Sequence, residues 1–210
     1  MTSRARCLTV KRAAAFLTAG LLAFLGSTSQ ARAAEVNVVK ALLFTCPVCR
    51  TAESLDASID AEARRLGGSL VHAPLPVKGD FSAYAYYALR GQGAKTASEV
   101  RLALYKGSQD RGLTFSSRLD VDVWLQSDLA ESSLNLDALR GEAEDPAVTQ
   151  AVARAYRLGI AAGVNHTPTY IVLRNNQIFA SIDPTSVTPQ NSLTAVRDAV
   201  VAKLREAAKD

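Results

Sequence analysis

Two cysteines separated by two residues, Cys46 and Cys49, stand where a strand-like run passes directly into a run with helical spacing. The preceding residues 36–44, VNVVKALLF, are mostly β-branched or apolar and predict a buried strand. Over residues 47–66 the apolar and small positions recur at helical spacing, and two glycines end the pattern. The chain is therefore expected to carry a dithiol at the N-terminus of a helix, immediately after a strand.

This placement predicts different roles for the two sulfur atoms. A thiol at a helix N-terminus lies at the positive end of the helix dipole and beside unpaired backbone N–H groups, which favour the thiolate. Cys46 holds that position, whereas Cys49 lies one turn further in, where burial disfavours charge. We expect Cys46 to be the attacking nucleophile and Cys49 the resolving thiol. Pro47 suits the first helical turn, where its missing N–H is not needed.

The first 33 residues have the profile of a secretory signal peptide. Basic residues precede an uncharged apolar run at 13–26, and small residues follow, with Ala31 and Ala33 forming an A-x-A cleavage site. The apolar run is shorter than the roughly 20 residues of a membrane-spanning helix, which disfavours an uncleaved anchor. We expect cleavage before Ala34, export to the periplasm, and a mature domain of residues 34–210.

Removal of residues 1–33 changes the charge and the cysteine content. The whole chain has 24 Lys+Arg and 20 Asp+Glu; five of the basic residues and none of the acidic ones precede Ala34, which leaves 19 against 20. A near-neutral chain gives no electrostatic reason to expect binding to nucleic acid or to an acidic membrane surface. Because Cys7 is lost with the signal, Cys46 and Cys49 have no third thiol to react with, and their exchange partners must be other molecules.

Other uses of a cysteine pair fit the sequence less well. A structural disulfide across two intervening residues constrains the unfolded chain little. Zinc needs four ligands, and the mature chain adds only His72 and His166, in no ligand-like spacing. A hydrolase with His166 as base would have to keep Cys46 reduced beside a neighbour able to bridge it. We expect no metal, and no cofactor other than the redox-active disulfide Cys46–Cys49.

The remaining elements predict an α/β domain. Residues 69–75 predict a second strand, and Pro74 near its end indicates a sheet edge. Asn175 and Asn176 predict a hairpin turn between strands at 169–173 and 177–181, because Asn tolerates positive φ.

Helical sequence fills the middle and the end of the chain. Residues 81–161 form a helical block whose last helix starts at Asp145 and ends before Gly163, and a final helix is expected from Thr188. The order of elements predicts a mixed sheet with helices on both faces and the helical block inserted between its halves.

Two segments resemble the DsbA family of thioredoxin-fold thiol oxidoreductases: FTCPVC at residues 44–49 and GVNHTPTY at residues 163–170. The resemblance covers nearly all of the mature chain. It implies a thioredoxin-like fold with an inserted helical domain, here at about 81–161. It also implies a cis peptide bond before Pro168, and pairing of the Thr167 backbone with an extended substrate peptide.

Two positions depart from the best-known oxidising members of that family. Those members have His where this chain has Val48, so the reduced form is expected to be less stabilised and the pair to be a weaker oxidant. Thr167 stands where oxidases often have Val and related isomerases have Thr. Against an isomerase, residues 34–45 are too short for the dimerisation domain and linker that such isomerases carry before the dithiol.

The resemblance implies an enzyme that forms disulfides in exported proteins through a mixed disulfide on Cys46. By the same analogy, a DsbB-like membrane quinone reductase would reoxidise it, and we expect a monomer. Two alternatives stay open: a reductase or isomerase that works from the dithiol state, and a non-catalytic binding module of a secretion pathway.

Overall fold

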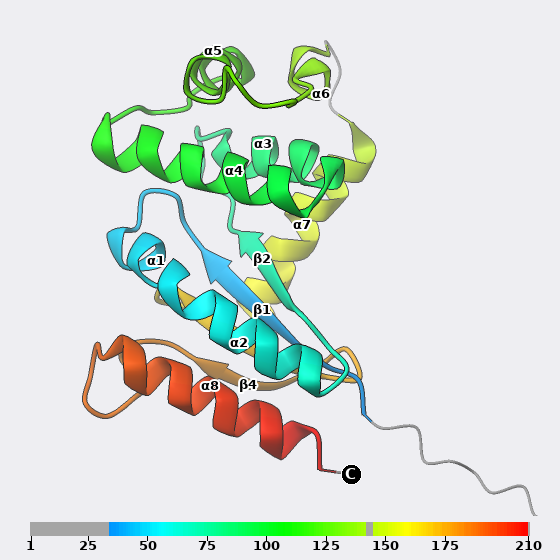
Figure 1. Cartoon of the computed structure of the whole chain (residues 1–210), viewed down its shortest axis with the longest axis vertical. Coiled ribbons are helices and arrows are strands. Elements are labelled where there is room, and N and C mark those ends of the chain that lie inside the picture. The colour runs from blue at the N-terminus through cyan, green and yellow to red at the C-terminus, as the bar shows by residue number, and fades with distance from the viewer. Residues whose placement is uncertain (1–33, 142–144, 210) are drawn as a thin grey trace, which may run out of the picture. The chain divides into compact units, whose positions relative to one another are not determined.

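The computed structural model describes residues 34–141 and 145–209 (Figure 1). The expected signal peptide, residues 1–33, lies outside the described residues. Among the helices that are described, none is both long enough and apolar enough to span a membrane.

A four-stranded mixed sheet forms the centre, in the order β2-β1-β3-β4. Its strands are β1 (Val36–Leu42), β2 (Leu70–Pro74), β3 (Thr169–Arg174) and β4 (Gln177–Ile182). β1 pairs parallel with β2 and antiparallel with β3, and β3 pairs antiparallel with β4. The β2 strand is an edge strand, which agrees with the position predicted from Pro74, because an edge tolerates a residue without an N–H.

The β3–β4 hairpin turns at the predicted pair, Asn175 and Asn176. Both residues have positive φ, 51° and 62°. Asn175 also ties the turn to the start of β1, since its backbone N–H donates to the Glu35 carbonyl and its side chain accepts from the Glu35 N–H. The hairpin prediction is confirmed.

Helices occupy the rest of the domain. They are α1 (Pro47–Thr51), α2 (Glu53–Arg65), α3 (Ser82–Leu89), α4 (Ala94–Tyr105), α5 (Arg118–Asp128), α6 (Asp137–Arg140), α7 (Pro146–Ala161) and α8 (Leu193–Ala207), with a 3₁₀ turn η1 (Arg90–Gln92) and a π-helical turn η2 (Lys106–Asp110). Asp145 caps α7 by accepting from the Ala147 N–H at 2.7 Å, as predicted.

Two predicted helix boundaries were wrong. The single helix expected over 47–66 is broken at Ala52, whose carbonyl accepts a hydrogen bond from the buried Tyr170 hydroxyl at 3.3 Å. The last helix starts at Leu193, not Thr188, because Ser192 provides the side-chain cap on the Ala195 N–H. Residues 183–192 instead form turns, which include a second cis bond at Thr188–Pro189.

The sheet separates two apolar cores. On one face, Val36, Val38 and Val172 pack with α2 and α8. On the other face, Val39 and Ile171 pack with the helical block that runs from α3 to α7. Figure 1 shows α2 and α8 beside the sheet, α3 to α6 above it, and α7 running down from that layer alongside the strands. The predicted fold class, a thioredoxin-like α/β fold with an inserted helical domain, is confirmed.

Candidate active site

Cys46 occupies the N-cap of α1, between the end of β1 and the first helical turn. Its backbone is extended, with φ −89° and ψ 111°, and its sulfur accepts a hydrogen bond from the Cys49 backbone N–H at 3.2 Å. Pro47 is the first residue of α1, and Val48 is 44% exposed. Both side chains are apolar, so neither offers the sulfur a hydrogen bond. Cys46 is part-buried and Cys49 has no exposed surface. The outer sulfur is thus the one that another protein can reach.

The surroundings separate the pKa values of the two thiols. A hydrogen bond from the Cys49 side chain, with further ones from the Thr167 side chain and the backbone at Val48 and Cys49, lowers the pKa of Cys46 to about 6 against the opposing effect of burial. The hydrogen bond to Cys46 and burial raise the pKa of Cys49. At neutral pH, Cys46 is the thiolate and Cys49 keeps its proton.

The turn before β3 brings a distant segment against this sulfur. The Thr167–Pro168 bond is cis, which is the conformation that the family resemblance implies. The Cys46 thiol lies 3.2 Å from the Thr167 carbonyl oxygen and donates to it when protonated. Pro168 is buried, and the Thr169 hydroxyl closes the turn by donating to the His166 carbonyl at 2.6 Å. Cys46, Cys49, Thr167 and Pro168 therefore meet in one place.

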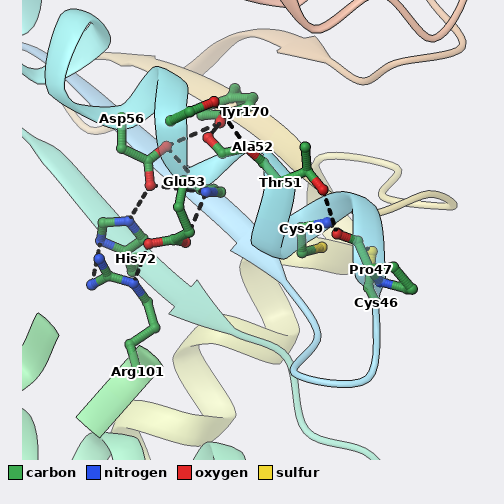
Figure 2. A network of polar contacts seen from close by, with 12 residues as sticks. Cys46, Pro47, Cys49, Thr51, Ala52, Glu53, Asp56, His72, Arg101 and Tyr170 are labelled. Carbon is green, nitrogen blue, oxygen red and sulfur yellow. Dashed lines mark hydrogen bonds and ion pairs between the residues drawn. The ribbon is translucent and has the colours of Figure 1, made fainter. Parts of the chain in front are cut away.

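A buried polar network lies on the sheet side of α1 and α2 (Figure 2). The Lys40 ammonium, fully buried on β1, donates to Glu53 at 2.9 Å and to Asp56 at 2.8 Å. Arg101, on α4, donates to the other oxygen of Glu53 at 2.7 Å. Two cations thus face two carboxylates, and the charges of this group cancel. Burial would raise the pKa of Asp56, but hydrogen bonding to His72 and the charge of Lys40 lower it further than burial raises it.

His72 takes part in this network through both of its ring nitrogens. Its Nε2 lies 2.7 Å from an Asp56 carboxylate oxygen and its Nδ1 lies 3.4 Å from an Arg101 nitrogen that can only donate. These partners assign the proton to Nε2. Glu53, Asp56 and His72 have donor atoms within 4.8 Å of one another, but the Lys40 ammonium already bonds both carboxylates. The group is an ion-pair network and does not offer a vacant metal site.

Solved structures of DsbA proteins match this chain over most of its length. Pseudomonas aeruginosa DsbA is 19% identical, with a TM-score of 0.60, and the match covers 84% of this chain and 87% of that one. NmDsbA1 from N. meningitidis is 17% identical, with a TM-score of 0.60 and coverage of 86% and 89%. SrgA from Salmonella enterica serovar Typhimurium is 21% identical, with a TM-score of 0.57 and coverage of 82% and 92%. This chain has the fold of the DsbA proteins. No protein-family model and no curated protein sequence matches it.

Within the DsbA fold, sequence reasoning missed two groups of residues. The network around Lys40 had a signal, because a lysine inside a strand predicted to be buried must find a carboxylate partner. Gln109 had none. It lies in η2, and its side chain donates to the carbonyls of Phe44 and Cys46 on either side of the turn that enters α1. Only the three-dimensional path of the helical block brings it there.

Proposed function

We propose that the protein is a periplasmic thiol:disulfide oxidoreductase that forms disulfides in exported proteins through Cys46 and Cys49. The observation that carries the proposal is the position of the Cys46 sulfur, which caps α1 and lies 3.2 Å from the Thr167 carbonyl of the cis-proline turn. A thiol with a pKa of about 6, beside a backbone edge that can pair with an extended peptide, is suited to exchange with a client cysteine.

The reaction begins with the oxidised pair. A client thiolate attacks the Cys46 sulfur, a client–Cys46 disulfide forms, and the Cys46–Cys49 bond breaks with Cys49 leaving as a thiolate. A second client thiolate attacks the client sulfur of this mixed disulfide, and Cys46 leaves as a thiolate. The client dithiol loses two electrons and two protons. The electrons reduce the cysteine pair, one proton goes to Cys49, whose pKa is raised, and the other goes to solvent.

The low pKa of Cys46 supports the oxidising direction, because a stabilised thiolate stabilises the reduced form and makes the disulfide a stronger oxidant. The side chain of Val48 provides no donor to that thiolate, and Thr167 is typical of isomerases, so a reductase or isomerase is the second candidate. Equilibration with glutathione distinguishes the two. We expect a reduction potential well above about −270 mV, the value of thioredoxin, and a potential near that value would support the reductase.

The compartment and the partners follow from the same proposal. Signal cleavage before Ala34 would deliver the domain of residues 34–210 to an oxidising compartment, and mass measurement of the exported protein tests that site. Its substrates would be exported proteins with cysteines. A DsbB-like membrane quinone reductase would accept electrons from the reduced pair, and no further cofactor enters the reaction.

Two variants test the assignment of the cysteines. We expect Cys46→Ser to lose oxidation of a reduced, unfolded secreted protein, and Cys49→Ala to accumulate a client disulfide on Cys46 that a reductant releases. The trapped species is measured by mass spectrometry. Client oxidation at the wild-type rate by Cys46→Ser would contradict the proposal and favour a non-catalytic binding module.

A further inference from the structure

The inserted helical block reaches the dithiol through the π-helical turn η2. This turn follows α4 directly, and the Arg111 N–H closes it on the Lys106 carbonyl, five residues earlier, at 3.2 Å. Each residue of a helix advances the side chains by roughly 100°, so the extra residue of a π turn reorients every side chain after it. The π geometry thus sets which side chain of η2 faces α1.

The side chain so directed is Gln109. Its Nε2 donates to the Phe44 carbonyl at 2.8 Å and to the Cys46 carbonyl at 3.0 Å. The Cys46 carbonyl also accepts the backbone N–H groups of Cys49 and Arg50, which open α1. One half-buried amide therefore holds both ends of the short turn that carries the reactive sulfur.

Packing keeps η2 in place. A Cβ on Gly107 would lie 2.6 Å from the Phe115 ring and 2.8 Å from the Trp124 ring nitrogen, so these rings pack directly on the glycine backbone. Trp124 also donates to the Ala103 carbonyl of α4 at 2.9 Å. The position of Gln109 is thus fixed from within the helical block.

We propose that Gln109 is a positioning residue through which the inserted helical block sets the reactivity of Cys46. This inference rests on the proposed function. The amide hydrogens are the positive end of a dipole held against the N-cap of α1, where the thiolate forms. Their removal destabilises the thiolate, and therefore the reduced state, in addition to loosening the turn.

A second contact across the same junction provides a matched control. The Arg50 guanidinium and the Asp110 carboxylate lie 2.6 Å apart, and both side chains are exposed. This ion pair joins α1 to η2 but does not touch the carbonyl of Cys46. Besides Cys46, the ionisable groups at this junction include Cys49, Arg50 and Asp110, and the charges of Lys106 and Arg111 act on Asp110.

The experiment compares Gln109→Met, Gln109→Glu and Gln109→Lys with Asp110→Asn. Thiolate absorbance near 240 nm gives the pKa of Cys46, and equilibration with reduced and oxidised glutathione at pH 7 gives the redox equilibrium constant. Met keeps the length but removes the donors, so we expect the equilibrium to move about 2.5-fold toward the disulfide. Glu adds a negative charge, so we expect the equilibrium to move about fivefold in the same direction. Lys restores a donor and is expected to leave the equilibrium at or beyond the wild-type position toward the dithiol.

The proposal is supported if the equilibria, ranked from most disulfide to most dithiol, follow the order Glu, Met, wild type, Lys. A purely structural loss would move all three variants in one direction. The proposal is overturned if the equilibrium constants of Gln109→Met and Gln109→Glu both stay within about 1.3-fold of wild type. It is also overturned if Asp110→Asn changes the constant as much as Gln109→Met does. Circular dichroism shows which variants fold. Any two folded variants of unlike charge are enough to test the proposal. Failure of wild-type protein to exchange with glutathione would instead refute the proposed function.

Discussion

Replacing Cys49 by Ala tests how the site lowers the pKa of Cys46. The Cys49 thiol makes the largest contribution through its hydrogen bond to the Cys46 sulfur. Ala removes that donor but leaves the backbone N–H of residue 49, which bonds the same sulfur at 3.2 Å. We therefore expect a partial rise in the pKa of Cys46, from about 6 toward the ordinary thiol value of 9.0 without reaching it.

The size of the rise follows from the interval between those two values. It corresponds to about 4 kcal/mol of preference for the thiolate, at about 1.4 kcal/mol per pH unit. Because Cys46 is partly exposed to solvent, we halve that figure to about 2 kcal/mol. Loss of the largest contributor then predicts a rise of about one pH unit in Cys49→Ala.

A titration of the thiolate absorbance near 240 nm between pH 4 and 10 gives the pKa of Cys46. The variant Cys46→Ala is the control that shows how much Cys49 contributes to the absorbance. The folded-state pKa lies below the unfolded one, so the thiolate stabilises the reduced protein fully above about pH 9. That stabilisation is lost as the pH falls through about 6. Urea unfolding of reduced protein at pH 8 and pH 5 should show this loss, and the loss should be smaller in Cys49→Ala. An unchanged pKa in that variant would refute the reasoning.

Three further substitutions have directions set by the structure. Val48→His places an imidazole on an exposed position of the first helical turn, and we expect a reduction potential about 30 mV or more higher by glutathione equilibration; an unchanged potential would show that residue 48 does not contact the thiolate. Lys40→Met leaves two carboxylates of α2 without their buried cation, and urea denaturation should show a loss of about 3–5 kcal/mol; a loss below about 1 kcal/mol would mean that the pair contributes little. Gly107→Ala forces a methyl group against the Phe115 ring, so the unfolding free energy in urea should fall by about 1–3 kcal/mol; an unchanged value would show that the π turn relaxes freely.

Sequence reasoning predicted the elements whose determinants are local. The strand before Cys46 is fixed by its β-branched residues, the hairpin by Asn175 and Asn176, and the start of α7 by Asp145. Each of these signals acts within a few residues of the element that it specifies. The order of such elements was enough to predict the sheet and the inserted block.

Features that depend on contacts distant in sequence could not be predicted. The break at Ala52 involves a hydroxyl from Tyr170, 118 residues away along the chain. Gln109 reaches the Cys46 carbonyl across 63 residues and depends on a π turn, for which the local sequence carries no recognised pattern. The meeting of Cys46 with Thr167 was expected because of the family resemblance, and not because of any property of the two residues alone.

The inserted block leaves the sheet domain after β2 and rejoins it at the Thr167–Pro168 turn, one of the two segments that form the site. The chain passes through α1 and β2 into α3, and it returns from α7 directly into the Thr167–Pro168 turn. Along the chain, the dithiol and the Thr167–Pro168 turn thus lie on either side of the inserted block. Insertions at the far side of that block, near residues 129–136, should leave their spacing unchanged, whereas one residue added to η2 or between α7 and Pro168 should alter it. This arrangement allows the distal surface of the block to vary in sequence while the contact between Cys46 and Thr167 stays constant.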